Sequence, residues 1–164
     1  MKEMLLDGHE IELEDQGHRW VISWHPPYAP PDGIAHGSAG ICVTDTREVV
    51  LISSDGKRWD FPAGRPEGCE TWEETLRREM LEEACAIVTE ARMLGFSRGR
   101  CIVGPEEGRI LVRSIWHAKV SLLEWNPHFE VSLRRLVPID QAITCAPTVF
   151  RPVWQRAFHE AGWS

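Results

Sequence analysis

The sequence has little positive charge, since 18 lysines and arginines face 25 aspartates and glutamates and leave a formal net charge of −7. This balance excludes an extended basic surface that coats nucleic acid, although a local basic pocket is compatible with it. Long hydrophobic runs are also missing: no stretch of 18 apolar residues exists, so no membrane span is predicted. The N-terminal residues show no basic start that leads into an apolar stretch, so no secretory signal is expected.

Paired cysteines and zinc-type spacings are absent as well. The five cysteines form no CxxC pair, and their odd number argues against a disulfide scaffold. We therefore expect reduced thiols in a cytoplasmic protein. The seven histidines show neither HxxxH nor HExxH spacing, so a structural zinc site is not expected.

The sequence does contain enough apolar material for one folded domain, because 43% of its 164 residues are hydrophobic. Three glycines and a proline predict a loop over residues 98–108. Apolar alternation and helical spacing predict strands over 10–13, 19–24, 40–44, 48–53, 58–61, 86–88, 92–96, 109–123 and 131–137, and helices after Thr71, from Pro138 and over 150–161. This order predicts an α+β fold with a mixed or antiparallel sheet.

Two parts of unequal size are expected. Residues 1–33 predict an N-terminal hairpin followed by a proline-rich loop, both packed on the main domain. Four prolines between His25 and Gly33 disfavour helix and central strand, so this loop is either a connector or the rim of a pocket. Residues 34–164 form the predicted main domain.

A glutamate-rich helix is the most informative segment. Thr71 precedes Glu74 by three residues, which is the spacing of a helix capping box. Glu79, Glu82 and Glu83 are three or four residues apart and therefore project from neighbouring positions on one helical face. Such a cluster suits a hard divalent cation, and the alternative is an acidic face that only contacts solvent.

The spacing around this helix favours the first interpretation. Gly64, Glu70 and the residues from Arg78 to Glu83 fit the pattern G-x5-E-x7-R-E-U-x-E-E, where U is a large aliphatic residue, here Met80. If each residue type makes up about 6% of ordinary chains, a chain of this length matches by chance with a probability on the order of 10⁻⁵. The pattern therefore indicates a functional site.

The segment from Gly64 to Ala86, GRPEGCETWEETLRREMLEEACA, resembles the signature of the Nudix hydrolase superfamily, and its lead-in WDFPAG is also similar. The resemblance implies an α/β/α sandwich around a mixed β-sheet, with the motif as a loop–helix–loop. It implies a hydrolase that uses Mg²⁺ or Mn²⁺ to cleave the diphosphate linkage of a nucleoside diphosphate derivative. A nucleoside triphosphate or a nucleotide sugar is favoured by elimination, and the protein is expected as a monomer or homodimer. The alternative is a catalytically silent Nudix-like module that binds a nucleotide or a partner.

The resemblance also implies the metal ligands. Glu79, Glu82 and Glu83 resemble the metal-binding glutamates of the family. The carbonyl of Ala63 lies where relatives often use a backbone ligand.

Three further residues resemble supporting parts of the motif. Arg78 resembles the arginine that orients and neutralises a motif glutamate, Glu70 the glutamate that braces the loop, and Gly64 the opening glycine. The sequence departs from the pattern at Cys85 and Ala86, where the family has a glycine and an aliphatic residue. Because a non-glycine residue in left-handed conformation costs about 1–2 kcal/mol, the helix is expected to end differently or to run one residue further.

The water that attacks phosphorus needs a base or a metal to activate it. Glu79 is the candidate inside the motif, and Glu130 is the candidate in a later loop, where relatives often place such a glutamate. Glu106 and Glu107 compete with Glu130 for this role. The predicted catalytic set is therefore Arg78, Glu79, Glu83 and Glu130.

Four residues are predicted to contact substrate. Arg65 follows the opening glycine and could reach a phosphate, and Arg58 lies near a turn on the approach. Trp24 and Tyr28 flank the proline-rich loop and could stack on a base. The alternatives are solvated arginines and aromatic rings that only pack the loop.

Overall fold

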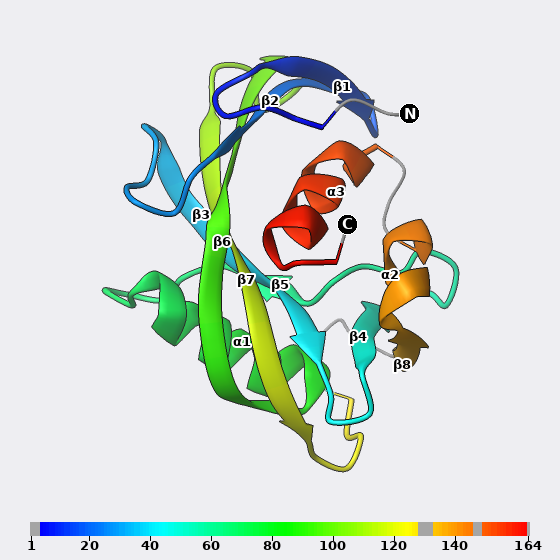
Figure 1. Ribbon diagram of the computed structural model, residues 1–164. Helices are drawn as coiled ribbons and strands as arrows, with labels where there is room; N and C mark the ends of the chain where they lie inside the picture. The colour runs from blue at the N-terminus through cyan, green and yellow to red at the C-terminus, as the bar shows by residue number, and fades with distance from the viewer. Residues whose placement is uncertain (1–3, 128–132, 146–148, 164) are drawn as a thin grey trace.

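Helices cover both faces of one sheet in the computed structural model, which describes residues 4–127, 133–145 and 149–163 (Figure 1). This arrangement confirms the predicted α+β sandwich. The strands are β1 (Ile11–Asp15), β2 (His18–His25), β3 (Ile34–Val43), β4 (Glu48–Ser53), β5 (Ala63–Gly64), β6 (Ala86–Val103), β7 (Ile110–Leu122) and β8 (Leu133–Pro138), and the helices are α1 (Trp72–Ala84), α2 (Ile139–Cys145) and α3 (Arg151–Glu160).

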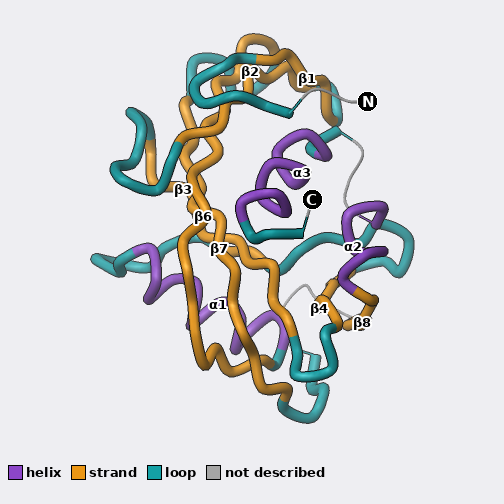
Figure 2. The backbone as a smooth tube through the Cα atoms, in the orientation of Figure 1, coloured by secondary structure: helices purple, strands orange, loops and turns teal. Residues whose placement is uncertain are grey.

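In the described part of the chain the strands form a mixed eight-stranded sheet in the order β1-β2-β6-β7-β3-β4-β8, with β5 paired to β3 (Figure 2). These neighbours are antiparallel except β3 and β7, which run parallel through the centre. Their register places Ile34 opposite Leu111 and Val43 opposite Lys119. The mixed sheet predicted from the sequence is therefore present.

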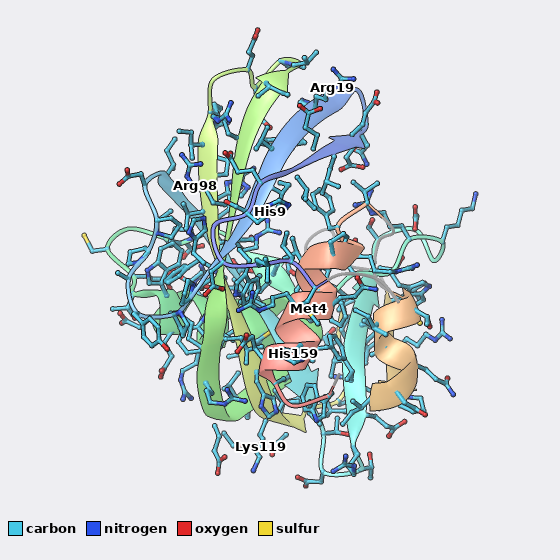
Figure 3. All side chains as sticks on the ribbon, turned by 45° about the horizontal axis from the view of Figure 1, so that its top comes forward. Met4, His9, Arg19, Arg98, Lys119 and His159 are labelled. Atoms are coloured by element: carbon cyan, nitrogen blue, oxygen red, sulfur yellow. The ribbon has the colours of Figure 1, made fainter. Side chains whose placement is uncertain are left out.

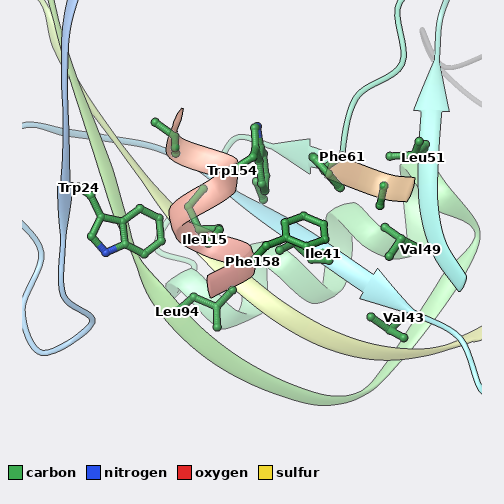
Figure 4. Packing of buried hydrophobic residues seen from close by; sticks show 14 of the residues in the cluster. Trp24, Ile41, Val43, Val49, Leu51, Phe61, Leu94, Ile115, Trp154 and Phe158 are labelled. Atoms are coloured by element: carbon green, nitrogen blue, oxygen red, sulfur yellow. The ribbon is translucent and has the colours of Figure 1, made fainter. Parts of the chain in front are cut away.

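Strand alternation divides the interior into two cores. Ile41 and Leu51 belong to the core on the face of the sheet that α3 covers, together with Phe158 and other apolar residues (Figure 4). Cys42 follows Ile41 and Val50 precedes Leu51 in the sequence, and both belong to the core that contains α1 on the other face. A strand buried on both faces needs apolar residues at consecutive positions, which explains the unbroken apolar runs of β3 and β4.

Helix α1 begins at the predicted capping box. Thr71 Oγ1 accepts from the Glu74 amide at 3.1 Å, and a Glu74 carboxylate oxygen accepts from the Thr71 amide at 3.0 Å. At the other end Cys85 takes the left-handed conformation, with φ 50° and ψ 47°. The expectation that the helix ends differently without glycine is therefore wrong, because Cys85 adopts the turn itself.

Strand β6 corrects another prediction. The loop predicted over residues 98–108 begins only after Val103, because the strand continues through Gly99. A Cβ built at Gly99 would lie 3.0 Å from Ile22 Cδ1 and 3.4 Å from the Trp20 ring. This glycine therefore allows the side chains of β2 to pack closely against the backbone of β6. Glycine inside a strand here marks a close approach and not a turn.

One other predicted strand is shorter than expected. Residues 58–61 contribute only a bridge, in which the amides and carbonyls of Ile52 and Asp60 exchange hydrogen bonds of 2.9 Å. The strand predicted over 131–137 is present from Leu133 as β8, and residues 131 and 132 lie outside the described part.

The N-terminal strands extend the main sheet. Strand β2 pairs antiparallel with β6 from Arg19 opposite Val103 to His25 opposite Phe96. Arg156 of α3 donates to the Leu5 carbonyl at 2.6 Å, which ties the segment before β1 to the helix.

Figure 3 shows the charged side chains of Arg19 and Lys119 projecting from opposite ends of the sheet. Among the described helices, none combines the length and the apolar character needed to cross a bilayer.

Candidate active site

The guanidinium of Arg78 forms the centre of the motif. Its Nε and Nη2 donate to the two oxygens of Glu70 at 2.8 and 2.9 Å. Its Nη1 donates to Glu79 at 2.7 Å and to Glu82 at 3.1 Å, and Nη2 also donates to the carbonyl of Arg65 at 2.7 Å. One cation therefore holds three carboxylates and the loop backbone together.

Glu70 anchors the loop that precedes α1. Besides Arg78, its carboxylate accepts from the Glu67 amide at 2.7 Å and from the Thr75 hydroxyl at 3.2 Å. The hydrogen bonds from Arg78 are the main reason why the pKa of Glu70 falls to about 2, and the same contacts raise the pKa of Arg78. Glu70 thus stays ionised at all moderate pH values and fixes the arginine.

Glu79 lies behind the opening glycine of the motif. Its side chain is 12% exposed, and burial raises its pKa although the bond to Arg78 opposes this shift. A Cβ built at Gly64 would overlap the Glu79 carboxyl group, so any side chain at this position would displace it. Position 64 therefore requires glycine, because any larger residue would occupy the space of the Glu79 side chain.

Glu83 faces the loop from the last turn of α1. Its Oε2 accepts from the Ala63 amide at 3.4 Å, and both residues line the same cleft. Ala63 is itself held on the sheet, because β5 pairs it with Ala39 of β3.

The donor set fits a hard divalent cation in its chemistry. The carboxylates of Glu79, Glu82 and Glu83 and the carbonyl of Ala63 are all oxygen donors, which Mg²⁺ and Mn²⁺ prefer. As they stand, no three acidic, histidine or cysteine side chains in the described ranges converge closely enough to hold an ion. Glu79 and Glu82 are instead turned to Arg78, whose positive charge neutralises them. Cation binding would therefore require these carboxylates to turn toward a common point.

A cleft of about 670 Å³ adjoins the motif. It lies beside the core under α3, and residues from strands, loops and helix line it. Its walls include the aromatic rings of Trp20 and Trp154 and the polar side chains of His36, Asp60, Glu83 and Arg113. This combination of an apolar wall with a few polar groups is typical of a small-molecule site.

The polar groups of the cleft influence one another. Burial, followed by the charges of Arg113 and Arg65, lowers the pKa of His36 to about 4, so its imidazole is neutral at pH 7. Burial raises the pKa of Asp60 and lowers that of Arg113. The charges of Asp60 and Glu83 oppose the shift of Arg113.

The structure corrects the prediction for Trp24. Its side chain is fully buried in the core, where it packs against Gly95, so it cannot stack on a nucleotide base. A Cβ at Gly95 would collide with the Trp24 ring, which shows how closely the ring lies on β6. Tyr28, the other predicted aromatic contact, is 91% exposed and is not among the described residues that line the cleft.

The other predicted residues are distributed around the motif. Arg58 lines the cleft and forms ion pairs with Asp15 and Asp60, whereas Arg65 contributes its carbonyl to Arg78 and is not among the described residues of the cleft wall. Glu106 lines the cleft, and Glu107 is exposed. Glu130 lies outside the described residues.

The cleft residues that sequence reasoning missed include Trp20, His36 and Arg113. Arg113 carried a usable signal, because a charged residue between Val112 and Ile115 is unusual in an apolar strand. Trp20 and His36 carried no such sequence signal, because their positions in the cleft depend on how β2 and β3 lie relative to other strands.

Comparisons with known proteins agree with this fold and identify the family. The family model for the NUDIX domain matches residues 35–158. The fold is similar to that of a mutant of the Bacillus subtilis pyrophosphohydrolase BsRppH, with a TM-score of 0.67 and 22% identity over 94% of this chain and 98% of that one. It is also similar to a MutT protein from Methanosarcina mazei Go1, with a TM-score of 0.60 and 16% identity over 80% of this chain and 98% of that one. No curated protein sequence matches the chain.

Proposed function

The chain belongs to the Nudix family of hydrolases, which act on phosphoric anhydride bonds, and we propose that it is a metal-dependent pyrophosphohydrolase of a nucleoside diphosphate derivative. Water attacks phosphorus and breaks the diphosphate linkage. The observation that carries this proposal is the network of Arg78 with Glu70, Glu79 and Glu82, built beside a cleft that contains Glu83.

In this proposal Glu79, Glu82, Glu83 and the Ala63 carbonyl hold Mg²⁺ or Mn²⁺. The cation supplies positive charge that offsets the charge on the phosphate oxygens. Arg78 keeps Glu79 and Glu82 side by side despite their mutual repulsion, because it donates to both carboxylates. Glu70 fixes the arginine in this position, so the group that neutralises the acidic cluster is held in place by the fold.

The attacking water gives up a proton, and we propose Glu79 or Glu130 as the group that accepts it. Glu79 supports this role because its side chain is mostly buried and lies directly beside the opening glycine of the motif. Glu130 is retained on the family resemblance of its position in the sequence.

The substrate proposed is a nucleoside triphosphate or a nucleotide sugar. A cleft of about 670 Å³ suits a molecule of this size, since small-molecule sites commonly measure about 300–1,000 Å³. We propose Trp20 in place of Trp24 as the residue that stacks on the base. Trp20 lines the cleft, whereas Trp24 is buried in the core.

A substrate panel tests the proposal. Nucleoside triphosphates and nucleotide sugars are incubated with Mg²⁺, with Mn²⁺ and with excess chelator, and the products are separated by chromatography. We expect cleavage of a diphosphate linkage in at least one compound, with either metal, and its loss with chelator. Nucleotide binding without cleavage of any compound would contradict the proposal and favour the silent binding module.

A further inference from the structure

Arg113 lies on the face of β7 that lines the cleft. Leu111 and Ile115, its neighbours two positions away, line the same cleft, as strand alternation requires. The parallel register places Arg113 opposite Gly37 of β3, and the antiparallel register places it opposite Ser97 of β6. Its position is therefore fixed by the two central strands of the sheet.

The Nε–H group of Arg113 has no hydrogen-bond acceptor in the part of the chain that the structure describes, and it is shielded from solvent. Arg58, another arginine of the same cleft, is paired instead, because it lies 3.8 Å from Asp15 and 3.5 Å from Asp60. A shielded donor without an acceptor, on a charged group, is unfavourable unless a ligand completes it.

The glycine at position 37 brings the guanidinium of Arg113 close to the motif. A Cβ built at Gly37 would lie 3.7 Å from Arg113 Nε and would collide with the Gly64 carbonyl. Glycine at position 37 thus lets the guanidinium lie beside the opening residue of the motif without a side chain between them. The charges of Glu83 and Asp60 are also close enough to act on Arg113.

We propose that Arg113 binds the phosphate chain of the substrate, donating from its guanidinium to non-bridging oxygens of the diphosphate. A guanidinium presents its N–H groups in a fork that matches two phosphate oxygens, which an ammonium group does not. In a protein with a net charge of −7, a cation inside the cleft is needed beside the glutamates to attract an anion. Neighbouring His36 is neutral at pH 7 and adds hydrogen-bonding capacity to this part of the cleft.

This inference rests on the proposed function, but it concerns how the substrate is bound and not how it is cleaved. A binding measurement therefore tests it. The affinity for α,β-methylene-ADP, which resists hydrolysis at the diphosphate bridge, is measured by calorimetry with Mg²⁺ for the wild type and for R113M, R113K and R100M. Arg100 is the matched control, because it pairs with Glu10 and is not among the described cleft residues. We expect R113M to bind about 10- to 100-fold more weakly and R113K to recover only part of the loss, with R100M unchanged.

A second measurement follows the wild-type protein and uses R113K only to assign the signal. The side-chain Nε–Hε resonance of Arg113 is followed by NMR as inorganic pyrophosphate is added, and it is assigned by its absence in R113K. We expect this resonance to shift to saturation, because an unpartnered donor gains an acceptor. This test remains valid if R113M fails to fold.

Wild-type affinity in folded R113M, or a resonance that does not respond to saturating pyrophosphate, would overturn the role of Arg113. Either result would leave the proposed function standing if the wild type cleaves a compound of the substrate panel. Absence of cleavage together with Arg113-dependent binding of α,β-methylene-ADP would reject the enzymatic function and keep the phosphate site.

Discussion

Within the described part of the chain Arg78 donates five hydrogen bonds, which reach Glu70, Glu79, Glu82 and the Arg65 carbonyl and not Glu83. Replacing Glu83 therefore removes a charge from the proposed metal site without disturbing the arginine network. We expect E83Q to lower kcat about 100-fold or more at saturating Mg²⁺, because an amide cannot supply the charge of a carboxylate ligand. Steady-state kinetics on a substrate found in the panel would measure this loss.

The matched control is E73Q on the same helix. Glu73 is exposed and pairs with Arg77 at 3.0 Å, away from the arginine network of the motif. Near-normal turnover in folded E83Q, or an equal loss in E73Q, would contradict the assignment of Glu83 to the metal site.

Glu70 gives the protein a defined sensitivity to acid. Its pKa is about 2 in the folded protein, against an ordinary value of 4.5, so the unfolded chain binds more protons between these limits. The stabilisation from Glu70 is therefore complete above about pH 4.5 and is lost as the pH falls toward 2. We expect E70Q to be less stable than the wild type at pH 7, with a difference that narrows from pH 4.5 downward in denaturant titrations.

E73Q again serves as the control, since it removes one glutamate from a surface position near the same helix end. A difference between wild type and E70Q that stays constant from pH 7 to pH 2.5 would show that the bonds to Arg78 do not hold Glu70 ionised.

At the residue scale, the motif could be predicted because its members are close in sequence. A helix converts spacings of three and four residues into one face, so Glu79, Glu82 and Glu83 needed no knowledge of the sheet. Trp24 could not be placed in this way. Its burial depends on Gly95, which lies far along the chain and leaves room for the ring on β6.

Helix α1 shows how far local rules reach at the scale of an element. Its start follows from the reciprocal bonds of Thr71 and Glu74, which the sequence displays as a capping box. Its end was mispredicted because the energetic preference for glycine was given too much weight. Cys85 accepts the left-handed conformation, and its thiol donates to the Asn126 carbonyl at 3.4 Å.

The left-handed conformation of Cys85 predicts that two substitutions at this position change the stability by different amounts. We expect C85G to change the free energy of unfolding by less than about 1 kcal/mol, because relief of left-handed strain offsets the greater chain entropy of glycine. We expect C85V to destabilise by about 2 kcal/mol or more, because a β-branched residue fits this conformation poorly. Denaturant titration would measure both.

Cys101 provides the control, because it is also buried but lies within strand β6. C101V should cost less than about 1.5 kcal/mol, since valine suits a strand and has a similar size. Equal losses in C85V and C101V would show that the backbone at Cys85 carries no strain of consequence.

Strand β6 shows where local rules stop. Glycine density predicted a loop after residue 97, but the same glycine at position 99 permits Ile22 and Trp20 to lie on the strand. Whether a glycine makes a turn or a close contact depends on the neighbouring strand, which is not adjacent in sequence.

Metal binding should be visible at the scale of the whole molecule. A divalent ion that binds only the folded state at 100 times its Kd adds about 2.7 kcal/mol to stability. For a domain of this size we expect the melting temperature to rise by about 5–10 °C with millimolar Mg²⁺ or Mn²⁺. Differential scanning fluorimetry would detect this rise.

Two control experiments show whether the rise in melting temperature comes from metal binding at the acidic cluster. Na⁺ at matched ionic strength should not reproduce it, and E83Q should lose most of it while E73Q keeps it. Equal shifts in the wild type and E83Q would place the ion elsewhere on the protein.

The cleft could not be predicted as a whole, because its residues come from segments that only the completed sheet brings together. Trp20 comes from β2, His36 from β3 and Arg113 from β7, whereas the motif runs from the end of β5 through α1. No spacing within the sequence connects these positions.

The central parallel pair has a kinetic consequence. Strand β3 must wait for β7, because their register joins residues as distant in sequence as Ile34 and Leu111. Closing so long a loop is slow and is rewarded only when the strands meet, so a nascent chain carries β3 with an open edge until β7 has been synthesised. Since Gly37 and Arg113 face each other across this pair of strands, a species in which β3 and β7 have not yet paired should not bind a nucleotide.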